Sequence, residues 1–190
     1  VGSEMCIRDR LLVVGVAVYL ITRKKSSNKK SFWTAKTMAV GAMCMALSSV
    51  LSLIKLWPMP MGGSVTPASM LPLLLFAYCY GVGPGMVLGA LYGVMQFLLD
   101  GMAWAALGAI PNLLDYPIAF GLLGLAGCFR GSKAKMTAGF VLGCFGRFMA
   151  SFLSGFIFYG QYAPEGVNPV WYSLTYNGSY MLVECIICIA

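Results

Sequence analysis

The 190-residue chain is much richer in apolar residues than a soluble domain, with 59% hydrophobic and 10% charged residues and a mean hydropathy of +0.81. A soluble domain carries about 25% charged residues, so this chain cannot cover its surface with solvated groups. Its net charge of +7 does not indicate nucleic-acid binding, because the basic residues gather at the ends of apolar segments. The composition therefore excludes soluble and nucleic-acid-binding classes and predicts an integral membrane protein.

Residues 1–36 differ in character from the rest of the chain. Residues 1–10 are mixed and polar, residues 11–22 form an apolar run shorter than the roughly 20 residues of a span, and residues 23–31 are polar and basic. We interpret residues 1–36 as a non-native or truncated N-terminal segment with a basic linker. Its apolar run is either the remnant of an extra N-terminal helix, which we prefer, or a signal-like segment.

Six apolar segments follow and predict an all-α membrane protein. They cover about residues 37–57, 67–80, 83–99, 107–129, 136–159 and 170 onward, and short stretches rich in Gly, Pro or charge separate them. A helix needs about 20 apolar residues to cross the roughly 30 Å core of a bilayer. We therefore expect residues 37–190 to form a six-transmembrane-helix bundle that is C-terminally truncated within its last helix.

The charged residues between these segments predict the orientation. Basic residues precede the first segment, and Arg130, Lys133 and Lys135 lie between the fourth and the fifth. An even number of spans separates the two positions, and basic loops stay in the cytoplasm. We therefore expect a multi-pass plasma-membrane protein with the N-terminus of its six-helix domain inside. The loops after segments one, three and five, which contain Asp100 and Glu165, are expected outside.

Small residues recur at four-residue spacing in two segments. Gly85, Gly89 and Gly93 predict a close approach between helix backbones. Ala42 and Ala46 form a similar pair on the first segment, and we expect them to face a partner helix outside this chain.

Two carboxylates lie within the predicted spans, where a charge is costly and usually functional. Asp115 stands between Pro111 and Pro117, which disturb the helix and free backbone carbonyls. It is a ligand for a cation, a cap at the helix break or an ion-pair partner of Arg147. For Glu184 we favour an ion pair with Arg147 or a contact with another subunit.

Aromatic residues are concentrated between residues 156 and 180. Tyr172 and Tyr176 share a helix face, and Asn177 adjoins them. Aromatic rings, a carboxylate and an amide together suit a flat, cationic, heteroaromatic ligand. Anchoring at the membrane interface is the alternative for any single aromatic residue.

The sequence contains no motif for bond-making chemistry. It has no His, no GxSxG elbow and no P-loop lysine, and its single CxxC has no second pair to complete a zinc site. We therefore expect no catalytic residue, metal or cofactor, and we expect energy for any transport to come from a partner.

Four blocks of sequence carry a family resemblance. They are MGGSVTPASMLPLLLFAYCYG (61–81), LLDYPIAFGLLGLAGCFR (113–130), SGFIFYGQYAPEG (154–166) and YSLTYNGSYM (172–181). Over roughly residues 38–190 the chain resembles the thiamine-specific S component of energy-coupling-factor (ECF) transporters. The resemblance implies a six-helix subunit that captures thiamine outside and docks on a transmembrane coupling subunit driven by two ATPase subunits.

The resemblance also implies roles for individual residues. The implied ligand contacts are Asp115, Tyr159, Tyr172 and Asn177, with Gly155 on the same wall, and the implied contacts with the coupling subunit are Ala42 and Ala46. Ser151 stands where some relatives have a histidine. Gly63 stands near an aromatic of the first outer loop in some relatives, so Trp57 or Trp104 is expected to supply that wall.

The sequence thus predicts a high-affinity thiamine-binding subunit of an ECF-type importer, which is not an enzyme. Its expected partners are thiamine, the coupling module and the lipid bilayer. An S component for another flat vitamin or a thiamine precursor is the alternative within transport. A membrane enzyme acting on a lipid or prenyl substrate and a structural membrane subunit are the alternatives from other classes.

Overall fold

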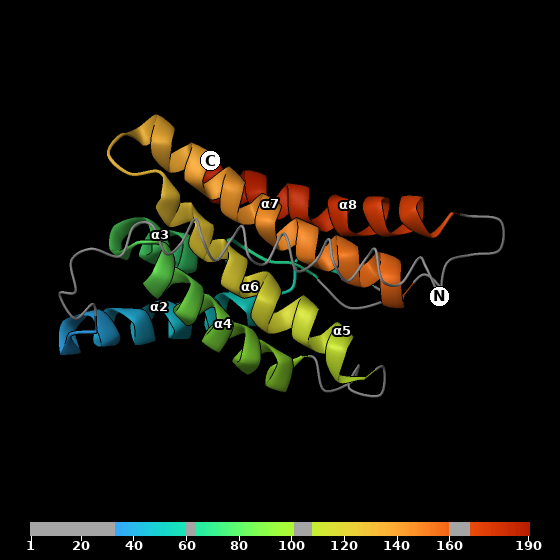
Figure 1. Cartoon of the computed structure of the whole chain (residues 1–190), viewed down its shortest axis with the longest axis horizontal. Helices are drawn as coiled ribbons and strands as arrows, with labels where there is room; N and C mark the ends of the chain where they lie inside the picture. Colours follow the sequence, from blue (N-terminus) through green and yellow to red (C-terminus); the bar gives the residue numbers. More distant parts are fainter. Residues whose placement is uncertain (1–32, 60–63, 101–107, 160–167) are drawn as a thin grey trace, which may run out of the picture. The chain divides into compact units, whose positions relative to one another are not determined.

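The computed structural model describes residues 33–59, 64–100, 108–159 and 168–190 (Figure 1). All of these except Trp33 and Thr34 belong to one compact unit, Ala35–Ala190. Its elements are α2 (Ala35–Leu53), β1 (Trp57–Pro58), β2 (Ser64–Val65), α3 (Leu71–Tyr80), α4 (Val82–Leu99), α5 (Ala109–Leu113), η2 (Leu114–Ile118), α6 (Ala119–Leu122), η3 (Leu123–Cys128), α7 (Lys133–Phe158) and α8 (Pro169–Ile189). The predicted all-helical membrane fold is confirmed, and the expectation for residues 1–36 falls almost wholly outside the described residues.

Four helices of the described part are long and apolar enough to cross a membrane. They are α2, α4, α7 and the continuous helical stretch Ala109–Cys128, which we call the broken helix. The ten residues of α3 extend only about 15 Å. The 21 residues of α8 extend over about 30 Å, and this helix turns Ser173, Asn177 and Glu184 inward. The chain is therefore a multi-pass membrane protein.

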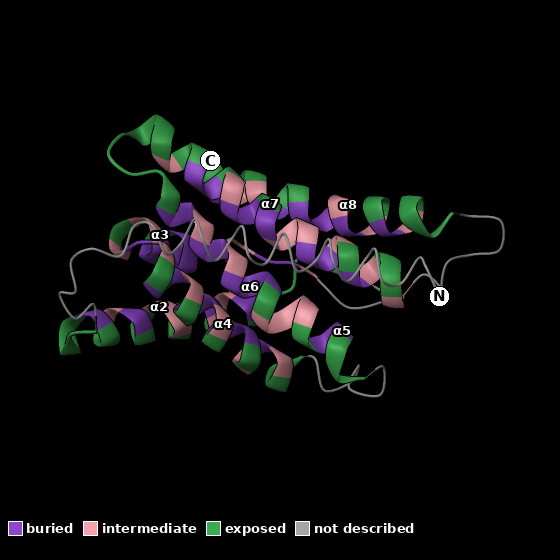
Figure 2. Cartoon of the chain, in the orientation of Figure 1, coloured by how far each residue is buried: buried purple, intermediate pink, exposed green. Residues whose placement is uncertain are grey.

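Large apolar side chains lie on the outside of the unit. On α2, for example, Met43 is 72% exposed and Leu53 is 69% exposed, whereas Ser48 and Ser52 are buried. Figure 2 shows the same arrangement along the other helices, with exposed residues outside and buried ones between the helices. An exterior of this kind is stable in lipid, where apolar side chains need no burial.

The broken helix packs closely against α4 through glycines. A side chain at Gly89 would meet the backbone carbonyl of Phe120, and one at Gly93 would meet that of Tyr116. A side chain at Gly85 would meet Ala77 of α3 and the backbone of Gly124. The predicted close approach is confirmed, and it fixes where the middle of the broken helix lies.

The broken helix changes its winding at the predicted distortion. It begins as an α-helix, widens to a π-helix over Leu114–Ile118 and ends as a 3₁₀ helix over Leu123–Cys128. Pro117 lies inside the π-helical turn and lacks the N–H that a regular helix would bond. Wide turns of this kind re-aim side chains and are frequent at functional sites. The turn carries Asp115 and Tyr116.

The Pro- and Gly-rich connection after α2 contains two short strands that the sequence did not predict. Trp57 pairs with Val65 and Pro58 with Ser64 in antiparallel register. Val65 packs against Tyr180 and Met181 of α8. This contact brings the connection against the far end of the chain, where it forms one wall of a cavity.

Replacing Gly89 by Ala is expected to destabilise the protein, because the new methyl group would overlap the Phe120 carbonyl. We expect a loss of about 1–3 kcal/mol in the free energy of unfolding, typical of overpacking. Thermal unfolding of the purified protein in detergent measures it. The matched control is Gly83→Ala, because nothing lies within 4 Å of a methyl group at Gly83. Equal melting temperatures for the two variants would contradict the packing described here.

Candidate ligand-binding cavity

A cavity of about 310 Å³ lies at one end of the helices. Its lining comes from the C-terminal ends of α2 and α4, the C-terminal half of α7, the N-terminal half of the broken helix, α8 between Tyr172 and Glu184, and the β1–β2 connection. The lining residues are Ser52, Lys55, Pro58, Met59, Ser64, Thr66, Ser69, Gln96, Asp100, Asp115, Tyr116, Phe120, Arg147, Ser151, Gly155, Tyr159, Tyr172, Ser173, Tyr176, Asn177, Tyr180 and Glu184. The size suits a small organic molecule.

Most of the residues singled out from the sequence line this cavity. They are Asp115, Ser151, Gly155, Tyr159, Tyr172 and Asn177. The other two, Gly63 and Trp104, lie outside the described residues. Trp57, the alternative to Trp104, is 68% exposed on β1 and does not line the cavity. The structure thus brings six predicted residues together, and their contacts with a ligand stay predictions.

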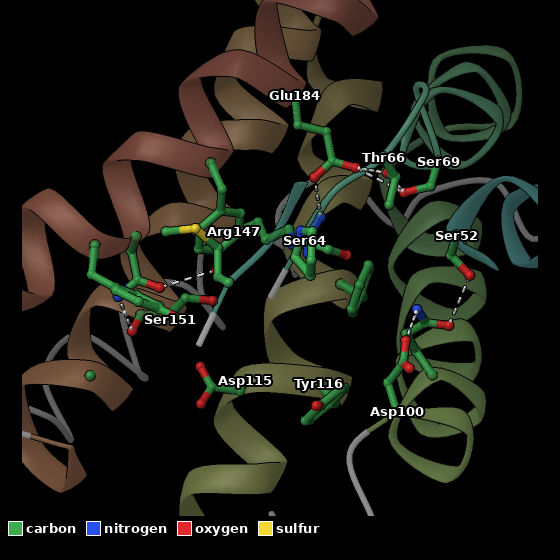
Figure 3. Close-up of a pocket in the computed structure, with 18 of the residues that line it drawn as sticks. Ser52, Ser64, Thr66, Ser69, Asp100, Asp115, Tyr116, Arg147, Ser151 and Glu184 are labelled. Atoms are coloured by element: carbon green, nitrogen blue, oxygen red, sulfur yellow. Dashed lines mark hydrogen bonds and ion pairs between the residues drawn. The ribbon is translucent and has the colours of Figure 1, made fainter. Parts of the chain in front are cut away.

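Asp115 projects from the π-helical turn into the cavity (Figure 3). Its Oδ2 accepts a hydrogen bond of 2.7 Å from the hydroxyl of Ser154 on α7. Among the residues that the structure describes, no basic side chain forms an ion pair with Asp115. The alternative in which Asp115 pairs with Arg147 is therefore wrong, and the carboxylate charge is left for another partner.

Arg147 instead pairs with Glu184, as the second sequence hypothesis proposed. Arg147 Nη1 lies 3.6 Å from Glu184 Oε2, and the guanidinium carbon lies 4.1 Å from the ring centre of Phe120. Glu184 is only 1% exposed, and its Oε1 accepts hydrogen bonds from Thr66 and from Ser69, the latter at 2.8 Å. Two hydroxyls thus donate to Oε1 of this buried carboxylate, and Oε2, which accepts no hydrogen bond from the described residues, faces the Arg147 cation. No sequence pattern marks Thr66 and Ser69 as partners of Glu184.

Asn177 occupies the interface between α7 and α8. Its Nδ2 donates to the backbone carbonyl of Ser173 at 3.1 Å and to that of Ser151 at 3.4 Å, and its Oδ1 accepts from the Tyr180 hydroxyl at 3.1 Å. Gly155 on α7 is pressed against this group, because a side chain there would meet the Ser173 hydroxyl and lie 3.0 Å from Asn177 Nδ2. The absence of a Cβ at Gly155 lets the two helices come together beside the cavity.

Tyrosine rings cover the N-terminal part of the α8 wall. Tyr172 and Tyr176 stack with centres 5.9 Å apart, and Tyr176 meets Tyr180 edge to face at 6.3 Å. Tyr116, next to Asp115, adds a ring from the opposite helix and packs edge to face on Phe97. These flat rings suit a planar ligand, since aromatic groups stack on one another.

The wall opposite α8 consists of polar side chains that form an ion pair and hydrogen bonds with one another. Lys55 Nζ lies 2.8 Å from Asp100 Oδ1, and the side-chain amide of Gln96 donates to Asp100 Oδ2 at 3.3 Å. The Ser52 hydroxyl donates to the side-chain Oε1 of Gln96 at 3.4 Å. In the sequence, Lys55 lies near the end of segment one, and Asp100 directly follows segment three. That shared position was a signal from which their pairing could have been predicted.

The charges of the lining residues therefore do not cancel. The lining contains two basic side chains, Lys55 and Arg147, and three acidic ones. Asp100 and Glu184 are used in the two ion pairs, which leaves the Asp115 charge in excess. In the described part of the chain, no group of three or more His, Cys, Asp or Glu residues could hold a metal ion. The described lining thus combines an excess negative charge with aromatic rings.

The fold and the cavity together define a class: a multi-pass helical membrane protein with a cavity whose size suits a small ligand. The model of the thiamine transporter protein family (Thia_YuaJ) matches residues 38–190, and the chain belongs to this family. The family consists of transporters and not of enzymes, and the resemblance seen in the sequence is confirmed.

Individual relatives agree with this assignment. The thiamine transporter ThiT of Bacillus subtilis is 38% identical over 144 residues, which cover 68% of this chain and 73% of that protein. ThiT of Lacticaseibacillus paracasei is 33% identical over 134 residues, covering 63% of this chain and 67% of that protein. A solved structure of ThiT from Listeria monocytogenes superposes with a TM-score of 0.70 at 22% identity, covering 80% of this chain and 88% of that one. That likeness shows a shared fold.

Proposed function

We propose that this chain is the thiamine-binding subunit of an ECF-type importer. The observation that carries the proposal is the Asp115 carboxylate, which faces the cavity without an ion pair to any described residue. Thiamine is a monocation, because its thiazolium ring carries a fixed positive charge, and its second ring is a planar aminopyrimidine. One excess negative charge among aromatic rings matches that chemistry. The names of the relatives support the same ligand.

Each cavity wall would have a separate part in recognition. Asp115 would neutralise the thiazolium charge or bind the exocyclic amine, and Tyr172 and Tyr159 would stack on the two rings. Internal hydrogen bonds to Ser151, Ser173 and Tyr180 hold the Asn177 amide, so its orientation is set before the ligand arrives. Such preorganisation lowers the entropy lost on binding.

We place the binding site at the outer face of the membrane. The cavity lies where α2, α4 and α7 end, and the loops that follow these helices lack basic residues except for Lys55 near the end of the first segment. The basic stretch Arg130 to Lys135 lies at the opposite end of α7, just before the helix and in its first turn. The positive-inside rule assigns that end to the cytoplasm and the cavity to the outside.

We propose that α2 docks on a transmembrane coupling subunit, which two ATPase subunits drive. Ala42 and Ala46 are exposed on α2 and lie one turn apart. Small residues at this spacing allow a partner helix to approach closely within a membrane. The chain itself has no P-loop motif for ATP hydrolysis. Binding outside would therefore be followed by docking, and the partner would supply the energy.

Asp115→Asn is expected to lower thiamine affinity by at least about thirtyfold, because the thiazolium would enter a cavity without a compensating charge. Asn177→Ala is expected to weaken binding as well, through loss of the oriented amide. Isothermal titration in detergent measures both, with riboflavin and the free aminopyrimidine fragment of thiamine as competitors. Near-wild-type thiamine affinity in folded Asp115→Asn protein would refute the site, and tighter binding of riboflavin would refute the ligand.

Ala46→Trp is expected to abolish uptake of labelled thiamine by cells while leaving thiamine affinity of the purified protein unchanged. The large ring would keep a partner helix away from α2, which lies apart from the ligand contacts. Ala138→Trp, at an exposed alanine of α7, is the matched control and should transport normally. Uptake at the control level by Ala46→Trp cells would contradict docking through α2.

A further inference from the structure

Glu184 makes contacts of two kinds from its buried position on α8. Its Oε1 accepts from the hydroxyls of Thr66 and Ser69, which follow β2. Its Oε2 lies 3.6 Å from Arg147 Nη1 on α7. A single carboxylate therefore anchors the β1–β2 connection and also neutralises the cation of the neighbouring helix (Figure 3).

Few other groups hold the Arg147 guanidinium in place. It lies over the Phe120 ring, and its Nε and Nη1 have no hydrogen-bond partner in the part of the chain that the structure describes. Arg147, Asp115 and Glu184 line the same cavity, and Arg147 lies between the two carboxylates in the view of Figure 3. The state of Arg147 therefore depends chiefly on its attraction to Glu184.

We propose that Glu184 is a positioning residue that sets the charge selectivity of the cavity. By neutralising Arg147, it leaves Asp115 as the carboxylate that prefers a singly charged cation over a neutral molecule of the same shape. The proposal rests on thiamine binding as proposed above. Without the Glu184 charge, Arg147 would be a buried cation with no counter-charge. It would then either pair with Asp115 or repel a cationic ligand, and both effects cancel the negative excess of the cavity.

The expected size of the effect follows from Coulomb's law. A unit charge acting over about 10 Å at an effective dielectric constant of about 20 changes affinity on the order of tenfold. A neutral ligand does not experience this attraction or repulsion. The ratio of the affinities for a cation and its neutral analogue therefore reports the charge of the cavity, whereas a purely structural defect would weaken both ligands together.

The test uses Glu184→Gln, because the glutamine carbonyl can still accept from Thr66 and Ser69 while the charge is removed. Isothermal titration of the full chain in detergent would use thiamine and its neutral analogue, in which thiophene replaces the thiazolium. We expect thiamine affinity to fall on the order of tenfold and affinity for the neutral analogue to stay unchanged. Equal affinity of wild type and Glu184→Gln for thiamine, or an equal loss for both ligands, would overturn the proposal.

A second variant separates charge from structure. Adding Arg147→Gln to Glu184→Gln removes both members of the pair and should restore the preference for thiamine, even if the single variant fails to fold. The control, Thr66→Val with Ser69→Ala, removes the anchoring hydroxyls but keeps every charge, so it should leave the preference intact. Loss of the preference in the double charge variant would overturn the proposal. A wild-type protein that binds neither ligand would overturn the proposed function as well.

Discussion

A carboxylate inside a membrane-spanning helix costs free energy unless a cation or several hydrogen-bond donors satisfy it. Asp115 receives one hydroxyl from Ser154 and no ion pair from the described residues, while Glu184 on the neighbouring wall receives a cation and two hydroxyls. The fold thus gives the two carboxylates different surroundings, because Glu184 is buried and Asp115 is partly exposed to the cavity. Glu184 serves the structure, and Asp115 remains available to a ligand.

Close packing of the helices at glycines holds the two carboxylates in these different surroundings. Glycines on α4 let the broken helix approach until Gly93 faces the Tyr116 carbonyl, which places the π-helical turn beside α4. Gly155 does the same for α7 and α8 around Asn177. Close backbone contact replaces the hydrophobic effect as the force that holds helices together in lipid. The cavity is therefore framed by closely packed helices, and hydrogen bonds fix the amide of Asn177 beside it.

Much of the fold could be predicted because it depends on local pattern. Hydropathy alone located all six helices, the prolines around Asp115 predicted the distorted turn, and glycine spacing predicted the close contacts. The contacts within the site were harder to predict from the sequence. Thr66 and Ser69 stand in a short connection without periodicity, and they meet Glu184 more than a hundred residues away. Which carboxylate Arg147 would choose also depended on tertiary packing, so the sequence left both pairings open.

The central claim is that the excess charge of the cavity selects a planar cation, and thiamine is the cation proposed. Isothermal titration of the purified, detergent-solubilised chain with thiamine, with riboflavin as the comparison ligand, tests this claim most directly. Saturable binding of one thiamine per chain, with no heat of binding from riboflavin, is the expected result. A folded protein that fails to bind thiamine, or binds riboflavin instead, would contradict the assignment of Asp115 as the residue that recognises the ligand.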